Sequence, residues 1–328
     1  MTEAIPLERK EGNVMVKKPE LLIPAGSTEE ARRYIEAGAD AVLVGEHRFG
    51  MRLPGEVPAE ELGALREWAH ARGASVYAAV NNIMDNRILP DLKAYMAKLQ
   101  EARVDGAVFG DPAVLMAARQ AAPDVKLHWN AEMTSTNYET ARYWGSKGAV
   151  RMVLARELNL EETLEIARQL EGTMEVQVQV HGITNIYHSK RSLLQNYKEH
   201  QGRFETISRE ELSKEEGLFL IEQERPNERF PVYEDENGTH IMSSDDMCML
   251  DSLHELMEGG VDSMKLESLL KSAEYNEAVI RSYRKVIDAY TVDPAGYEFQ
   301  EEWLDEIREL QDPNRELSYG FFFKEQVY

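Results

Sequence analysis

The stretch "LLIPAGSTEEARRYIEAGADAVLVG", residues 21–45, holds one complete strand–helix–strand repeat. Two apolar runs flank a segment that begins at Ser27, continues with two early glutamates and stops at Gly38. A Ser or Thr cap, an acidic first turn and a terminal glycine are the usual signals for the two ends of a helix. A buried strand, a helix and a second buried strand in this order predict a βα unit of a parallel sheet.

The same repeat recurs along the chain. Helical segments that end on glycine separate short β-rich runs at a spacing of roughly 25 to 30 residues. The β-rich runs are residues 21–26, 41–46, 75–82, 107–111, 127–133, 151–157, 176–182 and 263–268. Strands of this kind, in this number, predict an α/β fold of the TIM type, a closed (β/α)8 barrel.

The connection between the last two β-rich runs is much longer than the others. "VQVQVHG" (176–182) and "SMKLES" (263–268) lie roughly 80 residues apart, too far for an ordinary crossover. Asn237-Gly238 favours a tight hairpin, so we expect a small antiparallel β insertion between strands seven and eight. The predicted divisions are residues 20–185 for βα units one to seven, 186–245 for the insertion with its basic segment and hairpin, 246–290 for strand eight and the final helix, and 291–328 for a C-terminal helical tail.

Charge and composition limit the classes of partner. The chain has 37 Lys and Arg against 59 Asp and Glu, a net charge of −22, which repels polyanions at long range. One local basic segment stands out and is interpreted as RNA-binding, with a solvated helix face as the alternative: Lys190, Arg191, Lys198 and Arg203. The N-terminus lacks the apolar segment of a signal peptide, and no apolar run approaches the length of a membrane span. We therefore expect a cytoplasmic protein that does not contact a membrane.

Polar side chains follow the predicted strands at their carboxyl ends, which converge in a barrel. The candidate substrate-binding residues are Arg156, Gly26, Ser27, Asn81, Asn130 and Glu267. Arg156 offers a planar fork for a carboxylate or phosphate, and the Gly26-Ser27 turn offers backbone N–H groups at a helix start. These features predict a small anionic substrate. The alternatives are an ion pair of Arg156 with Glu132 or Glu157, and a plain helix cap at Ser27.

His181 ends the seventh β-rich run and is the candidate general acid or base. An unperturbed imidazole titrates near neutrality, and a histidine at the mouth of a barrel strand is well placed for proton transfer. Glu157 and Glu132 complete the candidate catalytic set. A structural hydrogen bond made by His181 is the alternative.

The common hydrolase and metal motifs are missing. "HELME" (254–258) carries Glu258 where the second histidine of a zinc site would stand, and the sequence has no HExxH or GxSxG motif and no nucleotide-binding glycine loop. Cys248 is the one cysteine in the sequence, so no disulfide and no thiolate metal site is expected from this chain alone.

Several longer motifs carry a family resemblance. They include the opening stretch, "HRFGMR", "VLARELNLEE", "FPVYEDENGTHIMSSDDMCMLD" and "GVDSMKLESLLKSAEYNEAVIRSYRKVIDAY". Together they resemble peptidase family U32, the collagenase-like proteins, over roughly residues 20–323. The resemblance implies a barrel core with an added β region. It also implies oxygen-independent hydroxylation, because better understood relatives hydroxylate nucleic acid bases or ubiquinone, apparently with prephenate as donor.

The chain departs from the family at the metal ligands. In family members the His-Gly pair is followed by cysteines that hold a [4Fe-4S] cluster, whereas Asn185 and Ser192 stand at the matching positions here. Cys248 lies in a different motif, and one thiolate does not replace four. The resemblance therefore implies that this chain binds no cofactor of its own. The [4Fe-4S] cluster would belong to a partner, a cluster-bearing paralogue of the same family.

Within the family, the chain is similar to the shorter, cluster-less member of a tRNA-hydroxylating pair. This implies a subunit or enzyme of 5-hydroxyuridine formation at the tRNA wobble position, with prephenate as co-substrate and tRNA as a partner. Two other readings are open. One is a collagenase-like peptidase, as the family name suggests. The other is a non-catalytic scaffold that stabilises the cluster-bearing paralogue.

Overall fold

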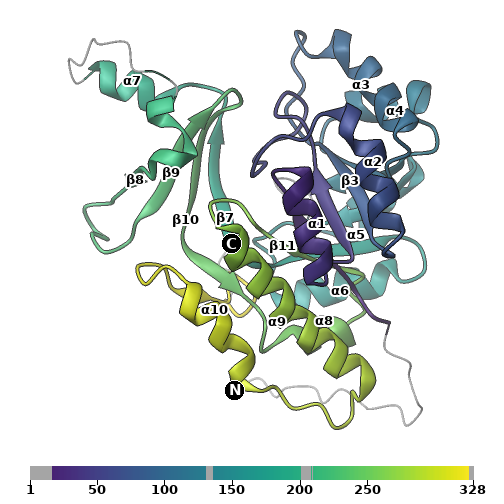
Figure 1. The fold of residues 1–328 in the computed structure, drawn as a ribbon, viewed down its shortest axis with the longest axis vertical. Helices are drawn as coiled ribbons and strands as arrows, with labels where there is room; N and C mark the ends of the chain where they lie inside the picture. The colour runs from purple at the N-terminus through teal and green to yellow at the C-terminus, as the bar shows by residue number, and fades with distance from the viewer. Residues whose placement is uncertain (1–16, 131–135, 201–207, 209, 325–328) are drawn as a thin grey trace.

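The computed structural model describes residues 17–130, 136–200, 208 and 210–324. In this part of the chain, parallel strands close into a barrel, because the last strand pairs with β1 on one side and with β7 on the other. The barrel strands are β1 (Glu20–Pro24), β2 (Ala41–Val44), β3 (Ser75–Val80), β4 (Gly106–Phe109), β5 (Lys126–Asn130), β6 (Ala149–Val153), β7 (Glu175–Ser189) and β11 (Ser263–Leu266). All eight predicted strands are present, and the TIM-type barrel is confirmed (Figure 1).

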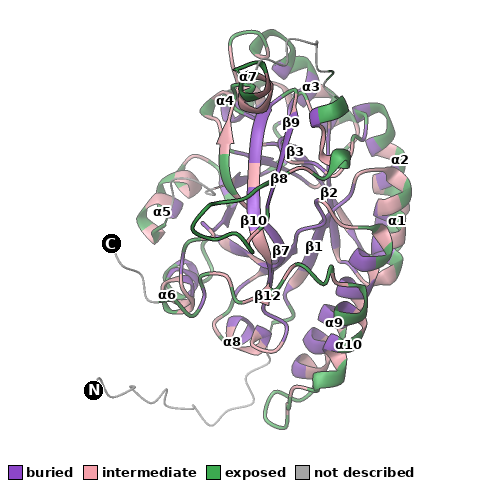
Figure 2. Ribbon diagram, turned by 90° about the vertical axis from the view of Figure 1, so that its left-hand side faces the viewer, coloured by how far each residue is buried: buried purple, intermediate pink, exposed green. Residues whose placement is uncertain are grey.

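Helices surround the barrel strands. They are α1 (Thr28–Ala37), α2 (Ala59–His70), α3 (Leu89–Glu101), α4 (Pro112–Ala121), α5 (Tyr138–Ser146), α6 (Leu160–Leu170), α8 (Leu253–Glu258) and α9 (Ala273–Val292). Side chains of β1 alternate between two layers: Leu21 and Ile23 pack with the helices, and Leu22 packs with Tyr77 inside the barrel. The strands are buried, while the outer faces of the helices are exposed (Figure 2).

The amino-terminal end of the barrel is closed by a buried ion-pair network. Arg151 of β6 is bonded to Glu20 of β1 at 2.5 Å and donates to Glu175 of β7 at 2.8 Å. Glu20 also accepts from the Tyr77 hydroxyl at 2.6 Å and from Ser263 of β11 at 2.9 Å. Five strands, β1, β3, β6, β7 and β11, are thereby tied together at the face that serves stability in such barrels.

β7 is longer than the sequence predicts. The expected end at His181-Gly182 is wrong, because the strand continues to Ser189 and pairs antiparallel with β10 (Gly238–Cys248). The backbone groups of residues 183–189 gain ladder partners in this way, which explains why the strand does not stop at the barrel rim. β7 therefore crosses the predicted division at 185/186 unbroken, and β10 crosses the one at 245/246.

The insertion lies between strands seven and eight, as predicted. It contains α7 (Leu193–His200), the short helices η1 (Glu210–Leu212) and η2 (Lys214–Glu216), and the strands β8 (Phe219–Leu220) and β9 (Phe230–Asp235). β9 and β10 form the expected hairpin at Asn237-Gly238, where Gly238 has a φ of 117°. In Figure 1 this layer stands beside the mouth of the barrel, with α7 at its far end.

The C-terminal tail returns to the barrel after α9. It forms η3 (Glu301–Leu304), α10 (Asp305–Leu310) and β12 (Leu317–Ser318), and β12 pairs with β10. Of the three phenylalanines of "GFFF" (320–323), only Phe322 is buried, and Phe321 and Phe323 are exposed. Phe322 alone faces the core because successive residues of this turn point in different directions. Within the described ranges, no helix has the length and apolar content needed to cross a lipid bilayer.

Gly182 offers a test of the close contact between β7 and β11. It has a φ of +93°, and a Cβ there would lie 2.4 Å from the Glu267 carbonyl oxygen. We expect Gly182→Ala to lower the free energy of unfolding by at least about 3 kcal/mol, from backbone strain and a clash that the sheet cannot relieve. Urea denaturation measures this loss. Gly73→Ala is the matched control, because Gly73 also has a positive φ but a Cβ there meets nothing within 4 Å. Equal losses in the two variants would contradict the clash.

Candidate functional site

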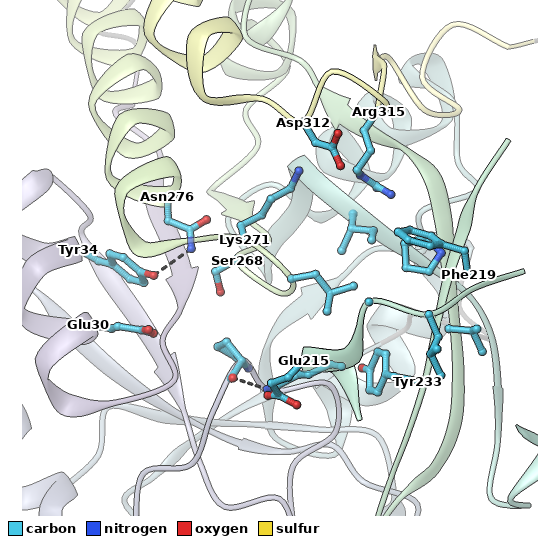
Figure 3. Close-up of a pocket in the computed structure, with 18 residues that line it drawn as sticks. Glu30, Tyr34, Glu215, Phe219, Tyr233, Ser268, Lys271, Asn276, Asp312 and Arg315 are labelled. Atoms are coloured by element: carbon cyan, nitrogen blue, oxygen red, sulfur yellow. Dashed lines mark hydrogen bonds between the residues drawn. The ribbon is translucent and has the colours of Figure 1, made fainter. Parts of the chain in front are cut away.

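A cavity of about 460 Å³ lies at the carboxyl end of the barrel strands, between the barrel, the insertion and the tail. Its walls come from α1, the segment from η2 to β9, the loop after β11, the start of α9 and the tail after α10 (Figure 3). Phe219, Tyr233 and Leu270 supply apolar surface, whereas Lys271 and Arg315 bring positive charge to one end. The cavity thus combines an apolar wall with a charged end, which is typical of sites for small organic ligands.

The charged end is organised by Asp246, the fully buried carboxylate of β10. It accepts hydrogen bonds from Arg315 at 2.8 and 3.1 Å and from Gln311 at 2.7 Å, and it forms an ion pair with Lys271 at 2.5 Å. Burial alone would raise the pKa of Asp246, but the Arg315 hydrogen bonds and the Lys271 charge outweigh it and hold the pKa well below its usual range. Asp246 therefore stays ionised and fixes both cations.

His181 lies behind this cavity and is almost completely buried. Its Nε2 is 3.0 Å from the hydroxyl of Tyr275, and its Nδ1 is 3.4 Å from the hydroxyl of Tyr283. Burial lowers the pKa of His181 to about 3, so the ring is neutral near pH 7. The ammonium nitrogen of Lys271 lies over the ring of Tyr275, 4.7 Å from the ring centre. The geometry favours a structural hydrogen bonder, and a catalytic role of His181 stays a prediction.

The predicted substrate-binding residues do not meet in the cavity. Gly26 donates its N–H to Glu30 at 2.8 Å, and the Ser27 hydroxyl accepts from the backbone N–H of Glu30 at 3.1 Å, the arrangement of a plain helix cap. Asn81 accepts from the N–H of Met51 at 3.0 Å. Glu267 accepts from Lys265 at 2.9 Å. These groups are bonded to other residues near the strand ends, and their binding role stays a prediction.

Arg156 lines a second, much smaller cavity of about 10 Å³, with Gln179 and Phe322. Among the described residues its Nε has no hydrogen-bond partner. Asn130 lies half-buried at the end of β5, and Glu157 is exposed after β6. Glu132 lies outside the described residues, so the proposed ion pair between Arg156 and Glu132 is not described.

The basic segment lies at the far end of the insertion. Lys190 donates to the carbonyl oxygen of Ile83 at 2.7 Å, which connects the insertion to the loop after β3. Arg191 is exposed, and Lys198 is half-buried on α7. Arg203 lies outside the described residues. Arg191 and Lys198 are the members of the segment that are available to a partner.

Sequence reasoning missed Lys271 and Arg315 as site residues. Arg315 lies in an acidic tail that returns over the barrel, 69 positions after Asp246. One signal was available for Lys271, which follows strand eight closely and belongs to the "GVDSMKLESLLKSAEYNEAVIRSYRKVIDAY" motif. A basic residue at either position is conspicuous among so many acids.

The chemistry of Cys248 bears on two of the predicted activities. Burial raises the pKa of its thiol to about 11, the opposite of what an activated nucleophile needs. Its sulfur lies 3.9 Å from the Tyr283 hydroxyl, inside the core. As the one cysteine of the sequence, it does not fit the four-thiolate donor set of an iron–sulfur cluster. Cys248 therefore supplies neither an activated nucleophile nor the ligand set of a cluster site.

Fold and cavity together define a (β/α)8 barrel protein with an antiparallel insertion at the barrel mouth. The chain belongs to Peptidase family U32, which matches residues 26–327. It is 51% identical over 314 residues to tRNA hydroxylation protein P2 of Bacillus subtilis (strain 168), covering 95% of this chain and 100% of the relative.

Two longer relatives match less closely. The chain is 31% identical over 321 residues to tRNA hydroxylation protein P1 of the same organism, covering 96% of this chain and 74% of that protein. It is also 31% identical over 309 residues to tRNA hydroxylation protein P of Escherichia coli (strain K12), covering 83% of this chain and 68% of that protein.

Asp246 provides a stability test of the charged end. Asp246→Asn leaves Lys271 and Arg315 buried without their shared counter-charge, so we expect a loss of about 3 to 5 kcal/mol in the free energy of unfolding. Asp288→Asn is the control, because Asp288 forms partly exposed ion pairs with Lys18 and Arg284. It should cost less than about 1 kcal/mol. Urea denaturation of both variants makes the comparison, and a loss in Asp246→Asn no larger than the control would refute the role given to Asp246.

His181 provides a pH test. Its pKa falls from 6.5 to about 3 on folding, so the unfolded chain binds a proton in this window and the folded chain does not. His181 therefore costs no stability above about pH 6.5. As the pH drops from 6.5 toward 3, it lowers the free energy of unfolding by about 1 kcal/mol per pH unit.

We expect His181→Gln to flatten the dependence of the unfolding free energy on pH between 6.5 and 5 by about that amount. Denaturation curves at several pH values give the slope. His200→Gln, at the exposed end of α7, controls for the loss of an imidazole. A slope unchanged by His181→Gln would show that His181 is protonated in the folded protein.

Proposed function

We propose that this chain is a subunit of a cytoplasmic system that hydroxylates the wobble uridine of tRNA, and that it works with a cluster-bearing paralogue of its own family. The observation that carries the proposal is the 51% identity to tRNA hydroxylation protein P2, whose whole length the chain covers. The same organism also has a tRNA hydroxylation protein P1, similar to this chain at 31% identity and longer. Two such proteins in one organism support a pair in which the members divide the work.

The proposed division of labour follows from the residues. The chain has Asn185 and Ser192 where the family resemblance places cluster cysteines, and Cys248 is buried. The [4Fe-4S] cluster is therefore assigned to the paralogue, and this chain is assigned to substrate binding. Prephenate is the proposed co-substrate. The charged end of the cavity, with Lys271 and Arg315, suits a carboxylate better than the turn at Gly26-Ser27, whose groups are already bonded.

The insertion is the proposed contact with tRNA. Arg191 and Lys198 carry positive charge at its far end, and the neighbouring β7 and α7 expose Tyr187 and Tyr197. Cationic groups hold phosphates, and exposed aromatic rings offer faces on which unpaired bases stack. Because the whole chain has a net charge of −22, such a local patch would determine where an RNA approaches.

The proposal is tested in cells of the source species. Deletion of the gene should remove wobble 5-hydroxyuridine from digested tRNA, as measured by mass spectrometry of the nucleosides, and the chain should co-purify with its paralogue. Complementation with Lys271→Gln separates a working subunit from a scaffold. Full recovery by this variant would favour the scaffold, whereas unchanged hydroxyuridine in the deletion strain would refute the proposal.

The RNA contact has its own test. Arg191→Gln combined with Lys198→Gln should weaken tRNA binding by the purified complex with the paralogue. It should also reduce the dependence of log K on log salt by about one unit per lost phosphate contact. Filter binding at several salt concentrations measures both effects. Lys93→Gln combined with Lys285→Gln removes the same charge from two exposed positions on α3 and α9 and should leave the slope unchanged. Equal slopes in the two double variants would exclude the patch.

A further inference from the structure

The charged end of the cavity contains more positive than negative buried charge. Lys271 and Arg315 have side chains that are 8% and 9% exposed, and both bind the single fully buried carboxylate of Asp246. Asp312 also lines this end, but it is exposed and its charge is screened by water. Within the described part of the chain, one buried positive charge is therefore left without a buried partner, which is unfavourable unless an anion joins the group.

Arg315 also has unused hydrogen-bonding capacity. Its Nε and Nη2 bind Asp246, and Nη2 further donates to the carbonyl oxygens of Ser243 and Asp245 at 3.2 and 2.9 Å. Its Nη1 is buried and has no partner among the described residues. The guanidinium group is thus held rigidly from one side, while one nitrogen remains to be satisfied. In Figure 3, Arg315 and Lys271 extend toward each other at the same end of the cavity.

Apolar side chains line much of the rest of the cavity. Phe219, Leu218, Val232 and Leu270 line it, and Phe219 is 44% exposed, as expected of a residue at an entrance. Tyr233 adds a ring whose hydroxyl is buried and, like Arg315 Nη1, lacks a partner in the described part of the chain. Glu30 and Glu215 lie at the cavity wall away from Lys271 and Arg315 (Figure 3), and Lys214, whose ammonium group donates to the carbonyl oxygens of Leu53 and Pro54, also lines the cavity and acts on both carboxylates, so charges of both signs are present there.

We propose that this cavity binds a small organic acid, with one carboxylate against Lys271 and Arg315 and with an apolar ring or chain against Phe219 and Tyr233. A single carboxylate matches the surplus of one buried positive charge, whereas a phosphate dianion would exceed it. An arginine fork that is already fixed by its neighbours loses little freedom on binding, which favours a selective site. The assignment of this cavity as the co-substrate site of tRNA hydroxylation rests on the proposed function. Its assignment as a carboxylate site does not.

Matched ligands test the proposal on the purified full chain. Isothermal titration calorimetry compares phenylacetate with phenylacetamide, which has nearly the same shape but no charge, and includes prephenate and inorganic phosphate. Phenylacetate and prephenate should bind, and the amide and phosphate should bind at least about tenfold more weakly. Binding of the amide as tight as that of the acid, tighter binding of phosphate, or no binding of either acid would overturn the proposal.

Variants locate the site. Arg315→Lys and Lys271→Gln should each weaken phenylacetate at least about tenfold, and Phe219→Ala should weaken it several-fold. Phe219 is half exposed, so its removal leaves the fold intact and keeps the test decisive if the two charge variants do not fold. Arg308→Lys is the control, because Arg308 lies exposed on α10 and does not line the cavity. Unchanged affinity in Phe219→Ala and in every folded charge variant would place the ligand elsewhere.

The two proposals fail separately. If phenylacetate binds as expected while deletion of the gene leaves hydroxyuridine unchanged, the carboxylate site stands and the assignment to tRNA hydroxylation falls. If deletion removes hydroxyuridine while no acid binds, the reverse holds.

Discussion

The carboxylate of Asp246 is the interaction on which the mouth of the barrel depends. It lies on β10, the returning strand of the insertion, and it binds Lys271 from the loop after β11 and both Gln311 and Arg315 from the tail. Three segments that are far apart in the chain are therefore joined at one buried group. The Asp246 contacts hold these segments against one another on one side of the cavity, and α1 forms the opposite wall. Compared with an apolar replacement, a buried ion pair adds little net stability after desolvation, although removing one partner alone is costly. Its role here is to hold the segments of the site in place.

The long β7 strand explains why His181 does not face the central opening of the barrel. At the rim of an ordinary barrel, the residue after the last paired position faces the central opening. Here β7 goes on to pair with β10, and Cys248 of β10 lies directly opposite His181. Tyr275 and Tyr283 of α9 then cover the ring. The histidine that the sequence places at a mouth is enclosed by the sheet that extends past it, and the polar cavity forms on the neighbouring side, between insertion and tail.

The sequence was sufficient for the barrel because its signals are local and repeated. Each βα unit shows its own apolar run, and most of the helices end near a glycine, so the eight strands and the hairpin at Asn237-Gly238 were all predicted. The site was predicted less well, because the residues at strand ends are partly used in capping and turns, as Gly26 and Ser27 are. Arg315 reaches the cavity through a tail with little periodicity, and no local pattern reports a contact across 69 positions.

The continuity of β7 has a consequence for motion. Its first half belongs to the barrel and its second half to the insertion, and it is paired with β10 on both sides of Gly182, with a change of register between Ile183 and Asn185, so opening one half pulls on the ladder of the other. Amide groups on either side of Gly182 should therefore exchange their hydrogens as one cooperative unit. A ligand or partner that restrains the insertion would then protect the barrel rim as well, and contact at the far end of the hairpin would reach the cavity through the shared strand.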